Sequence, residues 1–268
     1  MKGLPCFFRG ATALVVAASA VMVTLASARA EDAPSKPNCT APSDLTRLDY
    51  TLKRTSAKIA AGQPIKIIAI GSSSTAGAGA SSPAMSYPSR LQAELQDLMP
   101  RVQVTVINRG VNGEEAREML ARFKSDVFPE NPDLVIWQVG SNSVLRDRPL
   151  AEANAPLHDG LKLLREQGAD VVLMNPQYAP KVITKHDVEG MVQLIATTAK
   201  EKNIDLFQRY AVMRYWQLTE GLPFNAFLSP DELHLNDWSY GCVAKLMAVA
   251  IHDAATRPTV TAIVNQRR

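Results

Sequence analysis

Short apolar runs and amphipathic stretches alternate along the chain from about residue 65 to residue 255. The run Ile65-Lys66-Ile67-Ile68-Ala69-Ile70 is rich in β-branched residues and stops at Gly71, which is typical of a buried strand. Similar apolar runs predict four further strands, at 102–107, 134–139, 171–174 and 204–207. Apolar residues at helical spacing predict helices at 87–99, 114–127, 150–167, 187–202 and 236–255, with a helical turn at 210–218. This alternation predicts a three-layer α/β fold, a doubly wound, flavodoxin-like parallel sheet of five strands with helices on both faces.

The two ends of the chain follow different patterns. Lys2 and Arg9 precede an apolar run of small residues at 11–28, and Ala28-Arg29-Ala30 is a typical cleavage site, so we predict a secretory signal peptide. An uncleaved membrane anchor is the alternative, because the run approaches the ~18 residues that a membrane span needs. The predicted segments are a signal peptide (1–30), an extended lead-in with an N-terminal helix at 45–61 (31–62), a main domain (63–256) and a loosely held tail (257–268).

The charge of the chain depends on this leader. Three of the 29 basic residues, Lys2, Arg9 and Arg29, lie in it, and it contains no acid, which leaves 26 basic against 26 acidic residues. A neutral mature chain without a Lys/Arg block gives no reason to expect nucleic acid or an anionic membrane as a partner.

The cysteines point to the same compartment. Of the three, Cys6 lies in the leader, and Cys39 and Cys242 remain as a pair. Because disulfides persist in exported proteins, we predict a bond between these two residues, which would tie the N-terminal segment to the last helix. Two reduced thiols are the alternative. Export to the periplasm or secretion from the cell are both compatible with this pattern.

Small and polar residues follow the strands at the edge where chemistry is expected in such a sheet. The first strand is followed by Gly71-Ser72-Ser73, the second by Asn108-Arg109-Gly110-Val111-Asn112-Gly113, and the third by Gly140-Ser141-Asn142-Ser143. Because the carboxyl ends of parallel strands share one edge, we expect these loops to lie side by side. Asp231 and His234 precede the last helix and are free to fold over them.

These residue types are the ones that acyl transfer requires. A serine hydroxyl becomes a nucleophile when a base removes its proton, and a neutral imidazole does this near pH 7. A carboxylate on the other ring nitrogen orients the imidazole. Backbone N–H groups and an amide side chain hold the developing oxyanion.

The order of these blocks resembles the SGNH (GDSL-type) hydrolase family over about residues 65–255. The family's GDS-x-T-x-G block is matched by Gly71-Ser72-Ser73-Ser74-Thr75-Ala76-Gly77, and its block-two glycine by Asn108-Arg109-Gly110. Its G-x-N-D block is matched by Gly140-Ser141-Asn142-Ser143 except at the last position, and its D-x-x-H block by Asp231 and His234.

The resemblance implies a role for each matched residue. Ser73 would be the nucleophile, His234 the base and Asp231 the acid that orients it. The N–H groups of Ser73 and Gly110 and the side chain of Asn142 would form the oxyanion hole. Two positions depart from the family pattern, because Ser72 and Ser143 stand where the family usually has aspartate. The departures suggest a less acidic rim and leave the triad intact.

Each matched residue also has an ordinary structural explanation. The serines at 72–74 could cap the following turn, and Asn142 could be a turn residue. Asp237 competes with Asp231 as the acid, although Asp237 and Asn236 are also suited to cap the last helix. The remaining histidines of the main domain are read as structural or surface residues: His158, His186 and His252.

The predicted function is therefore that of an exported serine esterase which hydrolyses a small acyl ester, such as an acetyl group on a carbohydrate. A lysophospholipase- or thioesterase-like acyl hydrolase and a non-catalytic glycan- or anion-binding protein on the same fold are the alternatives. The substrate would be a small molecule or a polysaccharide, and we expect no metal, no cofactor and no stable membrane insertion after signal cleavage. The loops 79–86, 177–185 and 214–227 are expected to form pocket walls. Their aromatic and large residues are candidates for substrate contact or for packing: Met85, Tyr87, Tyr178, Trp216 and Phe224.

Overall fold

The computed structural model describes residues 1, 3–4 and 37–257. Of the predicted signal peptide (1–30) only residues 1, 3 and 4 are described, and of the predicted tail (257–268) only residue 257. The rest of both segments lies outside the described residues. Within the described part of the chain, no helix is both long and apolar enough to cross a membrane.

All five predicted strands form, and they make one parallel sheet in the order β2-β1-β3-β4-β5. The apolar runs become strands because both faces of the sheet are covered, and residues 67–70 of the first strand, which has a neighbour on each side, are completely buried. This order is the flavodoxin-like one, so the predicted fold class is confirmed. The strands are β1 (Ile65–Gly71), β2 (Val104–Gly110), β3 (Leu134–Gln138), β4 (Asp170–Met174) and β5 (Asp205–Phe207).

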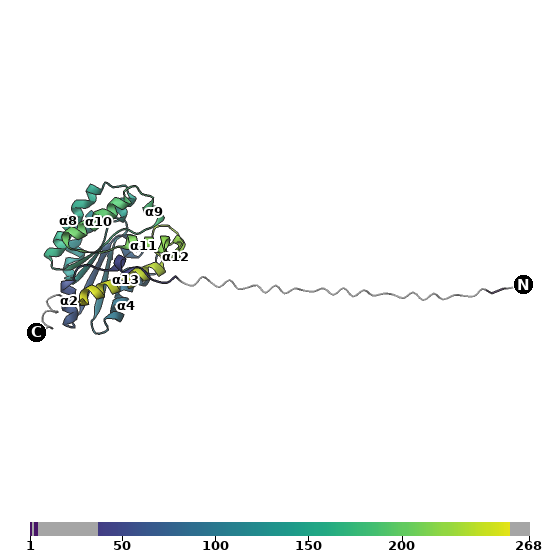
Figure 1. The fold of residues 1–268 in the computed structure, drawn as a ribbon, viewed down its shortest axis with the longest axis horizontal. Coiled ribbons are helices and arrows are strands. Elements are labelled where there is room, and N and C mark those ends of the chain that lie inside the picture. Colours follow the sequence, from purple (N-terminus) through teal and green to yellow (C-terminus); the bar gives the residue numbers. More distant parts are fainter. Residues whose placement is uncertain (2, 5–36, 258–268) are drawn as a thin grey trace. The chain divides into compact units, whose positions relative to one another are not determined.

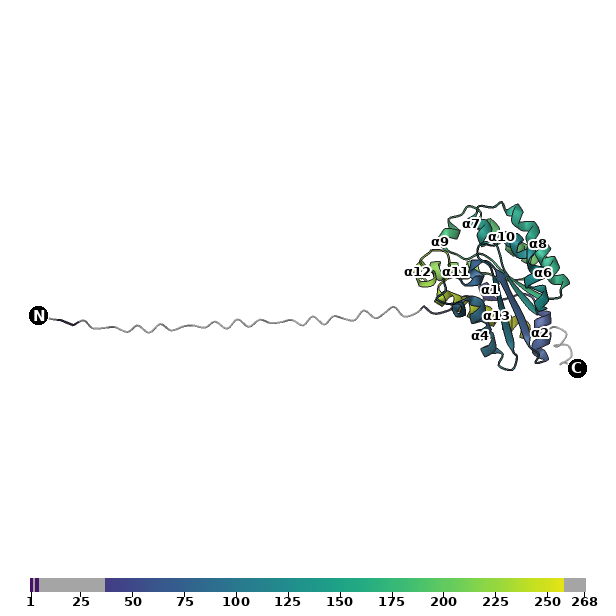
Figure 2. The same cartoon turned by 180° about the vertical axis from the view of Figure 1, so that it is seen from behind.

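The longer helices cover both faces of the sheet (Figures 1 and 2). On one side α13 packs against α4 and α2, and on the other α8 packs against α5 and α10. Their apolar stripes face the strands, as the helical spacing of leucines and alanines predicts. The longer helices are α2 (Lys53–Ala60), α4 (Tyr87–Leu98), α5 (Ala116–Ala121), α8 (Leu150–Glu166), α10 (Val188–Lys202), α11 (Arg209–Leu218) and α13 (Asp237–Thr256).

Short helical turns occupy many of the connections, and the sequence analysis predicted none of them as a separate element. The turn α3 directly follows β1, and α7 follows β3, so both stand at the carboxyl edge of the sheet. The short elements are α1 (Ser43–Thr46), α3 (Ser73–Ala76), α6 (Phe123–Asp126), α7 (Ser141–Leu145), α9 (Pro180–Ile183), α12 (Phe224–Phe227) and the 3₁₀ turns η1 (Pro83–Met85) and η2 (Phe128–Glu130).

The helix predicted at 45–61 is wrong in its first half. The structure has a short turn and then α2, with a non-helical segment between them. In that segment the Tyr50 N–H donates to Asp205 Oδ1 at 2.9 Å, across 155 residues. Leu48 and Leu52 on either side of it are buried. The carboxylate of Asp205 thus replaces a local hydrogen bond that a continuous helix would make. Burial of the two leucines in the core holds the same segment in its non-helical conformation.

Two further element boundaries differ from the prediction. The helix expected at 114–127 divides into α5 and α6 at Arg122, whose guanidinium donates to the Arg109 carbonyl at 2.7 Å and to Glu114 Oε2 at 2.7 Å. The second strand begins and ends later than the predicted 102–107. It continues to Gly110, which pairs with Gly71 of β1. Gly110 is therefore part of the sheet and not of the loop that follows it.

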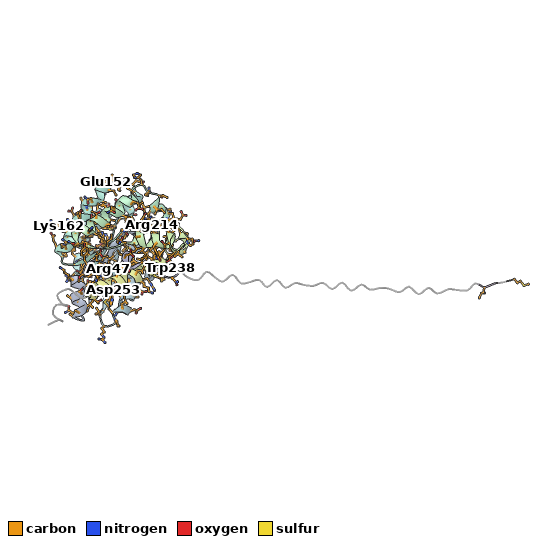
Figure 3. The ribbon with its side chains drawn as sticks, viewed as in Figure 1. Arg47, Glu152, Lys162, Arg214, Trp238 and Asp253 are labelled. Carbon is orange, nitrogen blue, oxygen red and sulfur yellow. A yellow bond between two sulfur atoms is a disulfide. The ribbon has the colours of Figure 1, made fainter. Side chains whose placement is uncertain are left out.

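The segment before α1 is fastened to the helical layer by three contacts. Cys39 and Cys242 form a disulfide, as predicted. Trp238, in the first turn of α13 and labelled in Figure 3, donates its indole N–H to the Pro37 carbonyl at 2.9 Å. Trp216 of α11 donates its indole N–H to the Thr40 carbonyl at 2.8 Å.

Candidate active site

Of the three adjacent serines after β1, Ser73 alone is not fully buried. Ser72 and Ser74 are 2% and 1% exposed, and both hydroxyls donate to Oε1 of Gln138, at 3.0 and 3.1 Å. Ser73 is half-buried, begins the short turn α3, and its N–H has no hydrogen-bond acceptor among the described residues. Burial and hydrogen bonding therefore leave one hydroxyl of the three available for a ligand.

His234 reaches this hydroxyl from the far end of the sequence. Its Nε2 lies 2.8 Å from Ser73 Oγ, across 161 residues, and its Nδ1 lies 2.5 Å from Asp231 Oδ2. Because Nδ1 faces a carboxylate, the geometry assigns the proton to Nδ1 and leaves Nε2 to accept from the serine hydroxyl. The loop leads directly into α13, whose first turn is held by reciprocal hydrogen bonds between Asn236 and Ser239.

Asp231 organises the loop as well as the imidazole. Its Oδ1 accepts from the Ser229 hydroxyl at 2.7 Å, the His234 N–H at 2.9 Å and the Leu233 N–H at 3.0 Å. Partial burial opposes ionisation, but the hydrogen bonds from His234, Ser229 and Leu233 outweigh it and hold the pKa of Asp231 well below its usual range. The carboxylate of Asp231 is therefore charged at neutral pH.

Asp237, the alternative acid, makes a different contact. It accepts from both the N–H and the hydroxyl of Ser81, at 2.8 and 2.6 Å. This pair joins the loop after α3 to the start of α13.

The two predicted oxyanion donors from other loops differ in their surroundings. Asn142, in α7, uses one amide proton on the Glu114 carbonyl at 2.8 Å and has a second one to donate. The N–H of Gly110 donates to Asn108 Oδ1 at 2.9 Å, so it is already occupied. A Cβ at Gly110 would lie 2.1 Å from the Ala76 nitrogen, which explains the glycine by close packing against α3.

Gly113, three residues further on, is a candidate donor that the sequence analysis overlooked. Its N–H makes no hydrogen bond to any described residue, and it directly precedes Glu114, which contacts Asn142. The same sequence block contains both glycines. Only the position of the strand end distinguishes them, because Gly110 lies inside β2 and Gly113 lies beyond it.

The two serines that replace the usual aspartates are both engaged. Besides its hydroxyl, Ser72 donates its N–H to Gln138 Oε1 at 2.9 Å. Ser143 donates to Glu115 Oε2 at 3.1 Å, and Arg146 donates to Oε1 of the same glutamate at 2.7 Å. Burial alone would raise the pKa of Glu115. The hydrogen bonds from Arg146 and Ser143 and the nearby arginine charges outweigh burial, so the pKa lies below its ordinary value. The rim beside α7 thus keeps one carboxylate, which is supplied from another loop.

The predicted wall residues separate into two groups. Tyr87 and Trp216 are each 1% exposed and belong to the core, so they are packing residues. Tyr178 and Phe224 are half-buried and stack with their ring centroids 6.1 Å apart. Met85 is also half-buried. Among the residues that the structure describes, no three His, Cys, Asp or Glu side chains gather in a way that could hold a metal.

A buried polar network beneath the site was also missed. Gln138, Ser141, Gln177 and Arg209 are each no more than 3% exposed and are linked by hydrogen bonds. These residues come from four separate elements and loops, so no local pattern in the sequence identifies them.

Comparison with known proteins finds esterases that resemble this chain. An arylesterase from Vibrio mimicus is 27% identical over 141 residues, which cover 51% of this chain and 69% of that protein. An acetylxylan esterase from Geobacillus stearothermophilus is 31% identical over 94 residues, which cover 31% of this chain and 43% of that protein.

Among solved structures, a two-domain esterase (CEX) active on acetylated mannans matches with a TM-score of 0.65 at 18% identity, covering 80% of this chain and 58% of that chain. The acetylxylan esterase Axe2 from Geobacillus stearothermophilus matches with a TM-score of 0.61 at 22% identity, covering 74% of this chain and 99% of that chain. At these identities the structural likeness is one of fold. The model of the non-GDSL lipase-like family matches residues 38–257, so the chain belongs to that family, and the predicted membership of the SGNH/GDSL-like hydrolases is confirmed.

Proposed function

We propose that the protein is an exported serine esterase in which Ser73, His234 and Asp231 form the catalytic triad. The observation that carries the proposal is the unbroken series of hydrogen bonds from Ser73 Oγ to His234 Nε2 and from His234 Nδ1 to Asp231 Oδ2, at 2.8 and 2.5 Å. Family membership and the esterases among its relatives support the class, a carboxylic ester hydrolase.

The reaction follows from the positions of the protons. His234 Nε2 takes the hydroxyl proton as Ser73 Oγ attacks the ester carbonyl, and Asp231 stabilises the resulting imidazolium. The imidazolium then protonates the leaving alcohol, which leaves an acyl group on Ser73. In the second half His234 Nε2 removes a proton from water as the water oxygen attacks the acyl-enzyme. The bond between the acyl group and Ser73 Oγ then breaks, the imidazolium returns its proton to Ser73 Oγ, and the carboxylic acid product leaves.

Three donors are proposed for the oxyanion: the Ser73 N–H, the second amide proton of Asn142 and the Gly113 N–H. The first and the last make no hydrogen bond within the described residues, and the Asn142 amide has one proton to spare. The family resemblance implies that Gly110 is an oxyanion donor. For this role, the hydrogen bond from the Gly110 N–H to Asn108 Oδ1 would first have to break. Each working donor is worth ~3 kcal/mol of barrier.

The proposed substrate is a small acyl ester, in particular acetyl on a carbohydrate. Relatives that are named for acetylxylan or that act on acetylated mannans support this choice. The open setting of the triad also supports it, because the side chain of Asp231 is 44% exposed and that of His234 14%. Such a setting admits an acetyl group carried by a bulky polymer. The disulfide between Cys39 and Cys242 supports export, to the periplasm or out of the cell.

Hydrolysis of p-nitrophenyl esters of increasing chain length, together with acetate release from acetylated xylan and mannan, tests the proposal. We expect the wild type to prefer acetyl esters and Ser73→Ala to lose activity. Ser82→Ala is the matched control, because Ser82 is exposed and lies in the neighbouring loop.

Equal rates in the wild type and Ser73→Ala would contradict the triad. No hydrolysis of any ester by the wild type would favour a non-catalytic glycan- or anion-binding protein. A preference for long chains would contradict the acetyl assignment and favour a lysophospholipase- or thioesterase-like hydrolase.

A further inference from the structure

Arg209 is a charged side chain buried directly beneath the candidate site. It is the first residue of α11 and is 1% exposed. Its Nε donates to the Asn175 carbonyl at 3.1 Å and its Nη1 to Ser74 Oγ at 2.9 Å. Its Nη2 donates to Gln177 Oε1 at 3.0 Å and to Ser141 Oγ at 3.4 Å. None of these partners is a carboxylate.

The partners of this guanidinium adjoin the proposed catalytic groups on three different loops. Ser74 directly follows the proposed nucleophile, and Ser141 directly precedes Asn142. Gln177 Nε2 donates to the carbonyl of Leu233, the residue before the proposed base, at 3.4 Å. One planar group therefore holds the nucleophile turn and the oxyanion-donor turn in register, and it reaches the histidine loop through a single glutamine.

Among the residues that the structure describes, no carboxylate pairs with the Arg209 guanidinium. A buried charge is normally paired, because desolvation without a counterion is costly. Burial lowers the pKa of Arg209 to about 10, so the guanidinium remains protonated at neutral pH. The nearby hydroxyls do not ionise either, since burial raises the pKa of Tyr87 from α4 to about 12 and raises that of Tyr240 from α13 further.

We propose that Arg209 is a positioning residue of the ester hydrolysis described above, and that its uncompensated positive charge favours the negative charge that develops at Ser73 and the oxyanion. The inference rests on the proposed function. It assigns a role to a residue outside the triad and outside the oxyanion hole, acting through the neighbours of both.

The physical reason is pre-organisation. During attack, negative charge grows on the carbonyl oxygen, and a fixed positive charge in a water-poor interior stabilises it without reorganisation. If the Arg209 guanidinium only held the three loops together, it would do so equally well with a carboxylate beside it. Such a carboxylate would also lower the cost of burying the charge. The structure instead offers the guanidinium only neutral acceptors.

This difference defines the test. Gln177→Glu places a carboxylate beside the guanidinium but also loses the N–H that donates to the Leu233 carbonyl, so Gln177→Met, which loses that donor without adding a charge, is its control. Arg209→Lys keeps the charge but loses the planar fork, and Arg209→Gln loses both. Arg54→Gln is the control for loss of an internal arginine, because Arg54 Nε pairs with Asp133 near the opposite ends of the strands. The readouts are kcat and KM on p-nitrophenyl acetate from about pH 5 to 9, and thermal unfolding.

We expect Arg209→Gln to lower kcat by ~100-fold and Arg209→Lys by ~10-fold, with KM nearly unchanged, because the stabilisation is specific to the transition state. Gln177→Glu should unfold at or above the temperature of Gln177→Met, yet have ~10-fold lower kcat than that control and an acidic limb of the pH profile that is shifted upward. The titratable groups that interact with the Arg209 charge are Tyr87 and Tyr240, which stay neutral across this range, and Asp231 stays charged across it.

Wild-type kcat and pH profile in Gln177→Glu would overturn the role of the charge, even if Arg209→Gln fails to fold. If Arg209→Lys also has the wild-type kcat, the proposal that the planar guanidinium positions the loops is overturned too. A wild type that is inactive, or a Ser73→Ala variant that is fully active, overturns the proposed function and this inference with it. Fully active Arg209 variants beside an inactive Ser73→Ala overturn only the role of Arg209.

Discussion

Replacing Asp231 by asparagine and by alanine separates two tasks of this carboxylate. One oxygen faces His234 Nδ1 at 2.5 Å, and the other accepts three hydrogen bonds that shape the loop. Asparagine can still accept those three through its carbonyl oxygen but offers an N–H₂ group to Nδ1. The ring then takes the tautomer with hydrogen on Nε2, which cannot accept the proton of Ser73.

The expected magnitudes follow from these contacts. Loss of the correct tautomer should lower kcat/KM by ~10⁴-fold in both variants, which is about 5 kcal/mol of barrier. Alanine also removes the three loop hydrogen bonds, each worth about 0.5–1.5 kcal/mol, toward the lower end here because Asp231 is 44% exposed. A loss of about 2 kcal/mol should lower the melting temperature by about 4–8 °C for Asp231→Ala, with a much smaller change for Asp231→Asn.

Steady-state kinetics on p-nitrophenyl acetate near pH 8 and thermal denaturation measure the two quantities independently. Equal melting temperatures for the two variants would refute the structural task of Asp231. An Asp231→Asn enzyme within tenfold of wild-type kcat/KM would refute the tautomer argument.

Three further predictions concern the scaffold. Burial raises the pKa of Asp205 from 3.8 to about 6, so the folded state holds the proton longer than the unfolded chain, and this residue's contribution to stability is lost as pH rises from about 4 to 6. Between these pH values the unfolding free energy of the wild type should fall by about 2 kcal/mol relative to Asp205→Asn in urea titrations, and parallel pH profiles would contradict the assignment. Replacing both Cys39 and Cys242 by serine removes a crosslink between residues 203 apart in the sequence. The unfolding free energy measured in urea should fall by about 3–5 kcal/mol, with kcat retained below the lowered melting temperature. An unchanged urea midpoint would contradict this prediction. Gly79→Ala should lower kcat by more than ~10-fold, because a Cβ there would lie 2.8 Å from the Cβ of His234, the proposed base. Gly62→Ala, with a similarly positive φ and open space around it, should lose only stability. Equal kcat in both variants would argue against a packing constraint on the histidine loop.

The fold and the order of the site blocks were predictable because their signals are local. A β-branched run that ends at Gly71 marks β1 as a buried strand, whichever strands lie beside it. Asp231 and His234 are three residues apart, so their pairing also depends on short-range geometry.

Features that depend on distant partners were not predictable in the same way. The helix expected at 45–61 breaks because the Tyr50 N–H is satisfied by Asp205, far along the chain. The choice between Gly110 and Gly113 depends on where β2 ends, which is decided by its register against β1. Arg209 has no sequence motif at all, because its acceptors come from three other loops.

The central claim, that Ser73 is a nucleophile activated by His234, is tested most directly by covalent labelling. The full-length protein is treated with a fluorophosphonate ester, digested and mapped by mass spectrometry. The account predicts one adduct, on Ser73, that is absent in Ser73→Ala and forms far more slowly in His234→Ala, while Ser82→Ala is labelled like the wild type. Absence of an adduct on Ser73, or labelling that is unaffected by His234→Ala, would contradict it.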